Sequence, residues 1–460
     1  MDRKSISRIA MLRRSRAMVT SRRLWKTRLV FWLGAITIGV FSTAFAYSAD
    51  YAHRVFTHLD GLLPHHTLPL LLTPAAFVMI AVVTRLYFPG AQGSGIPQAI
   101  AARQLRDDPD RGGLLFLKIA FGKVLLTLLG LACGASIGRE GPTVQVGAAI
   151  MMKSGRLGGM VQRRGLILAG SAAGIAAAFN TPLAGIVFAI EEMSRSYQVR
   201  TNGVVLSAVI LAGIAAVSIL GTYTYFGVSS AMATDLWGWL TVVACGLAGG
   251  LTGAIFSRSV IQITRAIRRW SPARPMRRVV IVSLVAGIVT AVIGFLMDGE
   301  TFGTGYDQAR AVVEGQAQPP LYFLGKLIAT LAATVSGIPG GLFAPSLSVG
   351  AGLGSSIALL MGSQVALAAL VGMAAYFAAV TQAPMTAFVI IFEMTGNHDA
   401  FGPIMIAAML GYGTSRFIAP EPLYHVLSRL FIADAIRGAR RAENARREEE
   451  GETVVAPSKG

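Results

Sequence analysis

The chain contains many apolar stretches that are each about as long as a bilayer is thick. A transmembrane helix needs roughly 20 consecutive apolar residues, and such stretches occur at 29–47, 68–87, 114–133, 165–190, 203–220, 236–257, 279–297, 321–337, 365–392 and 402–418. Only 14% of the 460 residues are charged, whereas soluble domains average about 25%. The sequence therefore predicts an all-α, multi-pass membrane protein. The shorter, glycine-rich stretches 142–152 and 346–361 predict broken or re-entrant helices that line a cavity.

The formal net charge of +18 is concentrated in blocks that flank the apolar stretches. Residues 1–28 hold ten Lys or Arg, the loop 258–278 holds seven Arg and no acid, and the tail 436–460 begins with Arg-rich sequence. Because Lys and Arg are enriched in cytoplasmic loops, we expect cytoplasmic N- and C-termini and no nucleic-acid partner. The expected location is the cell membrane, in bacteria the inner membrane, with 29–47 as the first transmembrane helix rather than a signal peptide.

An internal repeat divides the membrane region into two related halves, 29–225 and 230–430. Three pairs of segments keep the same order at nearly the same offset: 93–102 with 303–312, 122–150 with 325–353, and 170–191 with 372–393. Collinearity of three pairs argues against chance similarity. The basic blocks place the inside end of 236–257 at its C-terminus but that of 29–47 at its N-terminus, so the halves cross the membrane in opposite directions. Inverted repeats with broken helices are typical of transporters.

Three motifs combine Gly, Pro and other residues where a plain membrane helix would not have them. They are Gly93-Ser94-Gly95-Ile96-Pro97, Gly138-Arg139-Glu140-Gly141-Pro142 and Gly341-Leu342-Phe343-Ala344-Pro345. Each precedes an apolar run, and Pro is favoured in the first turn of a helix. The unpaired amides of helix N-termini could bind an anion without a full positive charge, which lets a permeating ion leave again. Such motifs can also mark kinks or close packing, but three of them favour an anion site.

These motifs, in this order, resemble the anion-site signatures of the CLC family of chloride channels and transporters. The stretch 177–193 and the late Pro422-Leu423-Tyr424 are similar to two further family sequences. The resemblance implies a homodimer in the lipid bilayer, with a pathway in each subunit and about 18 helices, many tilted, broken or re-entrant, in two inverted-topology repeats. The tail after residue 436 is too short for the CBS domains of many eukaryotic members, so the resemblance is to the prokaryotic type. It implies no cofactor, and no metal.

The resemblance also implies a set of chloride-binding residues, carried over by position in the motifs. They are Ser94, Arg139, Glu140, Leu342, Phe343, Ala344 and Tyr424. The hydroxyls of Ser94 and Tyr424 would contact a central chloride, and backbone amides would supply most of the other contacts. Members with Pro in place of Ser94 resemble nitrate carriers, and the altered motifs of the fluoride-exporting branch are absent from the sequence. Chloride is therefore the expected anion.

Carboxylates in a membrane span cost about 2.5–3.5 kcal/mol each, so each one needs an explanation. The resemblance makes Glu140 the external gate and proton acceptor, and Glu192 the internal proton-transfer residue. The repeat pairs Glu191 with Glu393, which predicts two structural counterparts, whereas Glu192 aligns with Met394. The alternative for Glu192 is a solvated carboxylate at a helix end, for which Arg195 or Arg200 could be the partner.

The implied function is exchange of chloride for protons, and the alternative is a passive voltage- or pH-gated chloride channel on the same fold. Family channels commonly carry a neutral residue where this chain has Glu192, which favours the exchanger. A third possibility is a serine hydrolase, because Gly134-Ala135-Ser136-Ile137-Gly138 matches the GxSxG pattern. All six histidines lie outside apolar spans or at their ends, so Ser136 has no evident base and we expect no enzyme.

Overall fold

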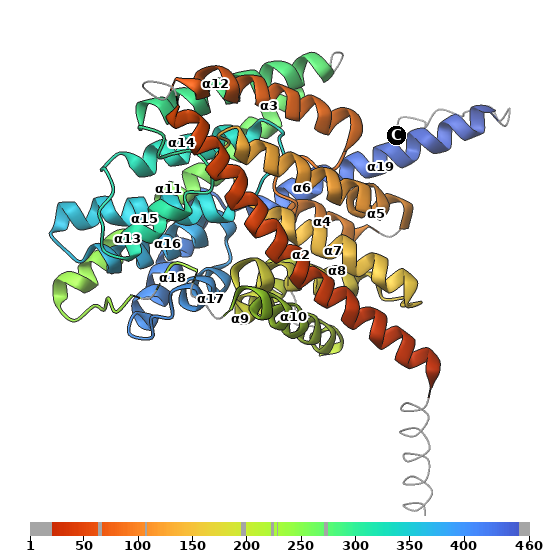
Figure 1. The fold of residues 1–460 in the computed structure, drawn as a ribbon, viewed down its shortest axis with the longest axis horizontal. Coiled ribbons are helices and arrows are strands. Elements are labelled where there is room, and N and C mark those ends of the chain that lie inside the picture. The colour runs from red at the N-terminus through yellow and green to blue at the C-terminus, as the bar shows by residue number, and fades with distance from the viewer. Residues whose placement is uncertain are drawn as a thin grey trace, which may run out of the picture.

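The computed structural model describes residues 21–62, 67–105, 108–194, 199–221, 225–227, 229–270 and 275–449. Every regular element among these residues is a helix (Figure 1), and the only extended pairing is two isolated β-bridges. The prediction of an all-α protein is thereby confirmed. The predictions for residues 1–20 and 450–460, at the two basic or charged ends, lie outside the described residues.

The helices form two successive series and a final helix. The first series is α2 (Arg22–Gly61), α3 (Leu68–Tyr87), α4 (Ile96–Gln104), α5 (Asp108–Leu115), α6 (Leu117–Ala132), α7 (Glu140–Leu157), α8 (Arg163–Phe179), α9 (Pro182–Phe188), the π-helix η2 (Ala189–Ser194) and α10 (Val199–Leu220). The second is α11 (Leu236–Arg269), α12 (Pro275–Leu296), α13 (Tyr306–Val313), α14 (Tyr322–Val335), α15 (Phe343–Met361), α16 (Val365–Thr381), α17 (Pro384–Thr395) and α18 (Phe401–Ile418), followed by α19 (Leu423–Glu449).

Seven of the described helices are long and apolar enough to cross a membrane. Helix α2 has 40 residues and α11 has 34. At 1.5 Å per residue they are about 60 and 50 Å long, twice or nearly twice the hydrocarbon thickness, so each must tilt in a membrane or extend beyond it. Figure 1 shows α2 running obliquely across the whole molecule.

Equivalent backbone features recur in the two series of helices. Asn180 and Gln382, which occupy matched positions in the repeat, each end their helix with a φ of 56°. This left-handed conformation is uncommon for residues other than Gly. Since two unrelated segments would not share it at matched positions, the backbone supports the repeat that the sequence predicts.

The two halves meet through contacts between counterpart residues. The amide of Gly138 donates to the carbonyl of Gly341 at 2.8 Å, and the amide of Gly341 donates back to the carbonyl of Gly138 at 2.6 Å. These two glycines align with each other in the repeat. A reciprocal pair between counterparts is what a local twofold axis produces, so the two halves are related by an approximate twofold rotation at this point.

Glu191 and Glu393 make a second reciprocal contact. Glu191 accepts hydrogen bonds from two amides in the first turn of α17, at 3.1 and 2.6 Å. Glu393 accepts from two amides in the first turn of α9, at 3.0 and 2.7 Å. Each carboxylate satisfies amides that have no acceptor within their own helix. The prediction that these two residues are structural counterparts is confirmed.

Two stretches that the sequence predicts as single spans are divided in the structure. The stretch 165–190 is interrupted after α8 and 365–392 after α16. In each case the chain turns at a residue immediately before a proline, Thr181 with φ −129° and Ala383 with φ −131°. A residue that precedes proline is disfavoured in the helical conformation, so the helix stops and restarts. The prediction of uninterrupted spans is therefore wrong.

Basic segments lie together at one edge of the molecule. The end of α11 is joined to α19 by ion pairs between Arg265 and Glu421 and between Arg268 and Asp434, both at 2.8 Å. Figure 1 shows the start of α2 and the end of α19 at the right-hand side of the molecule. This edge is called the basic edge below.

Candidate anion and proton site

The three glycine-containing motifs meet in the interior. The amide of Gly93 donates to the carbonyl of Ile338 at 3.0 Å, and the amide of Gly340 donates to the carbonyl of Gly93 at 3.1 Å. Together with the Gly138–Gly341 pair, these bonds bring the starts of α4, α7 and α15 into one region. The first amides of each helix have no acceptor in their own helix and carry the positive end of its dipole. The region is therefore suited to a negative charge.

The carboxylate of Glu140 lies over the start of α15. The side chain is fully buried, and its Oε2 atom accepts a long hydrogen bond of 3.5 Å from the amide of Ala344. A Cβ atom on Gly138 would lie 2.4 Å from that oxygen. Glycine at position 138 thus leaves the space that the carboxylate fills.

The guanidinium of Arg139 is held by α2, at a distance from the other motifs. It donates to Asp50 at 2.7 Å and to the carbonyl of Ala46 at 2.6 Å, and its second terminal nitrogen donates to the hydroxyl of Tyr225 at 3.3 Å. These bonds engage both terminal nitrogens, whereas the Nε atom is buried without a hydrogen-bond partner among the described residues.

Ser94 and Tyr424 place two hydroxyl groups in the same region. Both side chains are buried, and neither hydroxyl has a partner within 3.5 Å among the described residues, although the two hydroxyls lie near each other. The phenol of Tyr424 lies within interaction range of Ser94, Glu140 and Glu192. A buried polar group without a partner costs about 1–3 kcal/mol, so this pair of hydroxyls indicates a site for a polar ligand.

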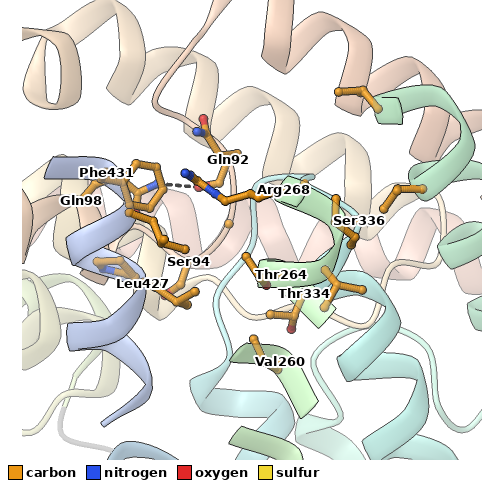
Figure 2. Close-up of a pocket in the computed structure, with 18 of the residues that line it drawn as sticks. Gln92, Ser94, Gln98, Val260, Thr264, Arg268, Thr334, Ser336, Leu427 and Phe431 are labelled. Carbon is orange, nitrogen blue, oxygen red and sulfur yellow. Dashed lines mark hydrogen bonds between the residues drawn. The ribbon is translucent and has the colours of Figure 1, made fainter. Parts of the chain in front are cut away.

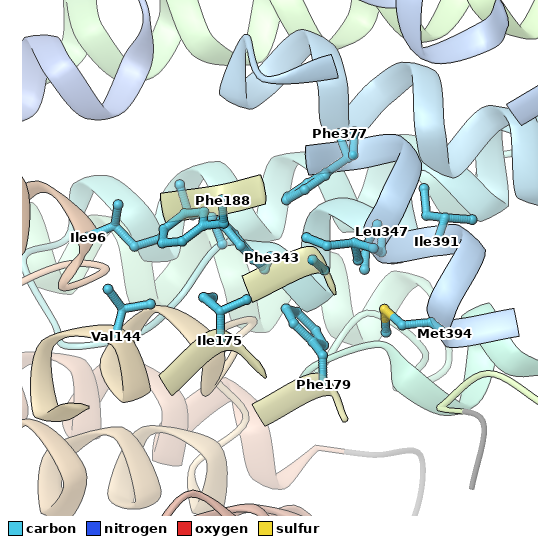
Figure 3. Close-up of a cluster of buried hydrophobic side chains, with 14 of the residues drawn as sticks. Ile96, Val144, Ile175, Phe179, Phe188, Phe343, Leu347, Phe377, Ile391 and Met394 are labelled. Carbon is cyan, nitrogen blue, oxygen red and sulfur yellow. The ribbon is translucent and has the colours of Figure 1, made fainter. Parts of the chain in front are cut away.

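Aromatic packing holds the start of α15 in place. Figure 3 shows the ring of Phe343 among those of Phe179, Phe188 and Phe377. The ring centroids of Phe343 and these three residues are 6.0, 6.0 and 4.7 Å apart, and the ring of Tyr424 is 6.1 Å from Phe343. Rings at these distances stabilise one another by dispersion and edge-to-face contact. The backbone amides near Phe343 are therefore rigidly positioned.

Glu192 lies on η2 in contact with a histidine that sequence reasoning did not assign. Its side chain is 1% exposed, so the carboxylate is not solvated in the single chain; the possible partners Arg195 and Arg200 have side chains outside the described residues. The Nε2 atom of His425 is 2.9 Å from the backbone oxygen of Glu192 and 3.8 Å from its Oε1 atom. The two residues are 233 positions apart in the chain, so no local pattern could have paired them.

Two fully buried lysines support the loops around the site. Lys123 donates to the carbonyl of Gly93 at 2.6 Å. Its repeat counterpart Lys326 donates to the carbonyls of Thr301 and Gly303, both at 2.9 Å. The two lysines are identical at matched positions of the repeat, which was the available signal for their shared role. Each side-chain nitrogen holds the loop that precedes α4 or α13.

A cavity of about 220 Å³ connects the region of Ser94 with the basic edge. Figure 2 shows Ser94 and Leu427 on one side of it and Thr264 and Thr334 on the other. Its lining includes Gln92, Arg268, Arg278, Leu342 and Phe431. It is called the inner cavity below.

Comparison with known proteins identifies the family. Residues 75–416 match the family described as Voltage gated chloride channel. The chain belongs to this family. A CLC relative, the H(+)/Cl(-) exchange transporter ClcA of Yersinia pestis bv. Antiqua (strain Angola), is 30% identical over 436 residues, which cover 87% of this chain and 88% of the relative. The protein of the same name from Citrobacter koseri is 28% identical, covering 93% and 94%.

Solved CLC structures share the fold. One described as a slow cyanobacterial Cl-/H+ antiporter has a TM-score of 0.76 at 24% identity, covering 89% of this chain and 98% of that one. A CLC-type fluoride/proton antiporter has a TM-score of 0.70 at 25% identity, covering 89% and 99%. The predicted CLC fold is confirmed by these likenesses. The ligand roles of the individual site residues stay predictions.

Proposed function

We propose that this CLC protein exchanges chloride for protons across a membrane and catalyses no chemical conversion. The observation that carries the proposal is the position of the Glu140 carboxylate over the start of α15, where helix amides favour a negative charge. A second buried acid, Glu192, lies within interaction range of Tyr424, as Glu140 does. Relatives over most of the chain's length carry the name of exchange transporters. The chloride-binding and proton-transfer roles of these residues are part of the proposal.

Exchange follows because the Glu140 carboxylate and a chloride ion compete for one position at the start of α15. An ionised Glu140 holds the place at the start of α15 through its charge and its contact with the Ala344 amide. Protonation removes the attraction to the amides and the helix dipole, so the side chain can leave and chloride can enter. The proton bound by Glu140 then passes to Glu192 or, in the opposite direction of exchange, comes from it. One acid thus serves both ions, which couples their movements.

The anion would be held mainly by neutral donors. The hydroxyls of Ser94 and Tyr424 and the first amides of α15 offer hydrogen bonds without a cation in contact. Weak, multiple contacts allow an ion both to enter and to leave. The buried ammonium groups of Lys123 and Lys326 donate to backbone carbonyls and are thereby committed to holding the loops.

We further propose that the protein is a homodimer in the bacterial inner membrane, with both termini in the cytoplasm. The basic edge supports this orientation, because basic segments remain in the cytoplasm. The outer faces of α10 and α18 are apolar and exposed in a single chain: Leu206, Ile210, Ile214, Met405, Ile406 and Met409 are all more than a third exposed. A second copy would cover these faces, and lipid would cover the remaining apolar surface.

A pH gradient imposed across proteoliposomes tests the function. An exchanger uses the proton gradient to move chloride against its own gradient, whereas a passive channel only lets chloride run downhill. Uphill chloride movement that stops when a protonophore dissipates the gradient would support exchange. Chloride flux without any proton movement would overturn the proposal in favour of the channel on the same fold.

A further inference from the structure

A second, larger cavity opens at the basic edge. Its volume is about 930 Å³, and its walls come from the ends of α3 and α11, the start of α12, and α19. Six arginines line it, against a single carboxylate, that of Asp434: Arg85, Arg268, Arg269, Arg278, Arg437 and Arg441. It is called the arginine cavity below.

Most of this positive charge is not neutralised by the protein. Asp434 pairs with Arg268 at 2.8 Å and with Arg437 at 2.6 Å. Arg85, Arg269 and Arg441 form no ion pair with a described residue, and Arg278 lies close enough to Arg85 and Arg268 for mutual repulsion. The lining therefore carries a formal surplus of five positive charges, which a bound polyanion would offset.

The shape of the cavity distinguishes it from basic surface in general. Basic residues on cytoplasmic loops are ordinary in a membrane protein, but these project from four separate elements into one concavity. Its volume lies within the roughly 300–1,000 Å³ typical of small-molecule sites. A chloride ion would fill little of that space. The guanidinium fork matches the oxygen atoms of a phosphate group, which it can bind through two parallel hydrogen bonds.

The arginine cavity adjoins the inner cavity. Both are lined by Gln92, Arg268, Arg278, Leu430 and Phe431, and the inner cavity continues to Ser94. A ligand in the arginine cavity would therefore stand at the mouth of the route that leads from the basic edge to the anion site. Occupancy would narrow the route and place negative charge in it.

We propose that the arginine cavity binds a phosphate-bearing polyanion and that binding slows chloride transport. The ligand is either a soluble polyphosphate compound or the headgroup of an anionic phospholipid, because both present clustered phosphate oxygens. The binding claim stands on the cavity alone, and the effect on transport rests on the proposed function.

Inorganic tripolyphosphate is the soluble probe. We expect it to bind the purified full-length protein by calorimetry, with an affinity that falls as salt is raised. The double substitution Arg269→Gln with Arg441→Gln should weaken binding at least about tenfold. Arg258→Gln is the matched control, because Arg258 lies on α11 at the same edge but does not line the cavity. Equal binding by wild type and double variant, or no binding at millimolar tripolyphosphate, overturns the proposal.

Flux measurements distinguish a soluble polyphosphate from a lipid headgroup as the ligand, and they test whether binding slows chloride transport. Tripolyphosphate on the side of the basic edge should slow chloride flux in wild type and much less in the double variant. If phosphatidic acid in the vesicles slows flux in the same variant-dependent way, the physiological source is a lipid headgroup. If the double variant only raises the chloride concentration needed for half-maximal flux and polyphosphate has no effect, the cavity merely attracts chloride and the proposal is wrong. Failure of proton exchange would leave the binding experiment unaffected.

The contact between His425 and Glu192 carries a second, independent inference. His425 is on α19, directly after Tyr424, and its side chain is 16% exposed, against 1% for Glu192. Part of the imidazole therefore reaches the surface of the single chain, whereas the carboxylate does not. The Nε2 atom of His425 donates to the backbone oxygen of Glu192 at 2.9 Å and lies 3.8 Å from Oε1, so a shift of less than about 1 Å exchanges the first contact for a hydrogen bond to the carboxylate.

We infer that His425 passes protons between solvent and Glu192. The Nε2–H of the imidazolium donates its proton to the Glu192 carboxylate, which leaves neutral imidazole and a carboxylic acid. A hydronium ion from solvent then returns a proton to the ring and becomes water. The inference rests on the proposed function, since it needs Glu192 to carry protons.

Paired proton and chloride fluxes test this inference. His425→Gln should slow proton movement severalfold and lower the ratio of protons to chloride, while chloride flux persists. Chloride flux is the control for folding, because misfolded protein loses both. If Glu192→Gln stops proton movement but His425→Gln leaves the ratio unchanged, this inference fails and the proposed function survives. If Glu192→Gln also leaves the ratio unchanged, the proposed proton path itself is wrong.

Discussion

Substitution of the adjacent acids Glu191 and Glu192 should have opposite consequences. Glu191→Gln should lower folding stability, whereas Glu192→Gln should stop proton movement. The Oε1 atom of Glu191 accepts a hydrogen bond from the amide of Met385, and its Oε2 atom accepts from the amide and the hydroxyl of Thr386. Glu191→Gln keeps one acceptor oxygen and turns an NH₂ group toward the other donor. One charge-assisted bond is lost, which costs about 1.5 kcal/mol of folding stability at a partly exposed helix start. Glu191→Ala loses all three bonds, at a cost of about 3 kcal/mol.

Glu192→Gln should leave stability intact and stop proton movement. The amide fills nearly the same volume as the carboxylate but cannot take up and release a proton. It also removes a charge that is expensive to bury, so the folded protein should be at least as stable as wild type. Chloride should still bind and still pass, because the anion contacts lie elsewhere.

Two measurements on the same preparations separate these outcomes. The midpoint temperature for loss of the monodisperse protein in detergent reports stability, and paired proton and chloride fluxes from proteoliposomes at a fixed pH gradient report coupling. Glu393→Gln is the matched control, since its carboxylate makes the equivalent contacts at α9 and should lower stability without uncoupling. If Glu192→Gln still moves protons uphill at nearly the wild-type rate, Glu192 is structural, and Glu191 is the nearest remaining acid.

The other predictions concern the gate, the anion and the assembly. Glu140→Gln should keep chloride flux but remove both proton coupling and the dependence of flux on pH, because the amide mimics the protonated gate; a pH series of flux checks this. Ser94→Pro should raise nitrate flux relative to chloride, since it removes a hydroxyl and an amide; unchanged relative flux would contradict the role of Ser94. Cysteines introduced on the exposed faces of α10 and α18 should cross-link two chains, and a cross-linked dimer with one inactive subunit should keep about half its flux; a shared central pathway would contradict this.

The class of fold and the pairing of the two halves could be predicted because both leave local signals. Apolar length reports membrane spans directly, and matched residues at a constant offset report a repeat. The sequence also identified Glu191 and Glu393 as counterparts, and the structure shows why they match: each holds the first turn of the other half's short helix.

The helix breaks and the long-range contacts could not be predicted in the same way. Hydropathy does not register the interruptions before Pro182 and Pro384, because the residues on both sides are equally apolar; the prolines themselves were the signal. The contact of His425 with Glu192 depends on how α19 returns to the interior. The arginine cavity likewise requires four elements to converge, so the sequence showed only basic blocks.

The approximate twofold axis explains which positions remain available for chemistry. Residues that meet across the axis must be compatible with their own counterparts, as Gly138 and Gly341 are. Identity at matched positions is therefore typical of scaffold residues. The two acids of the proposed mechanism have no acidic counterpart: Glu140 aligns with Phe343, and Glu192 aligns with Met394. Both acids lie in the first half of the chain. In the proposed mechanism the proton path therefore belongs to one half, whereas the start of α15 in the other half supplies the Ala344 amide that faces Glu140.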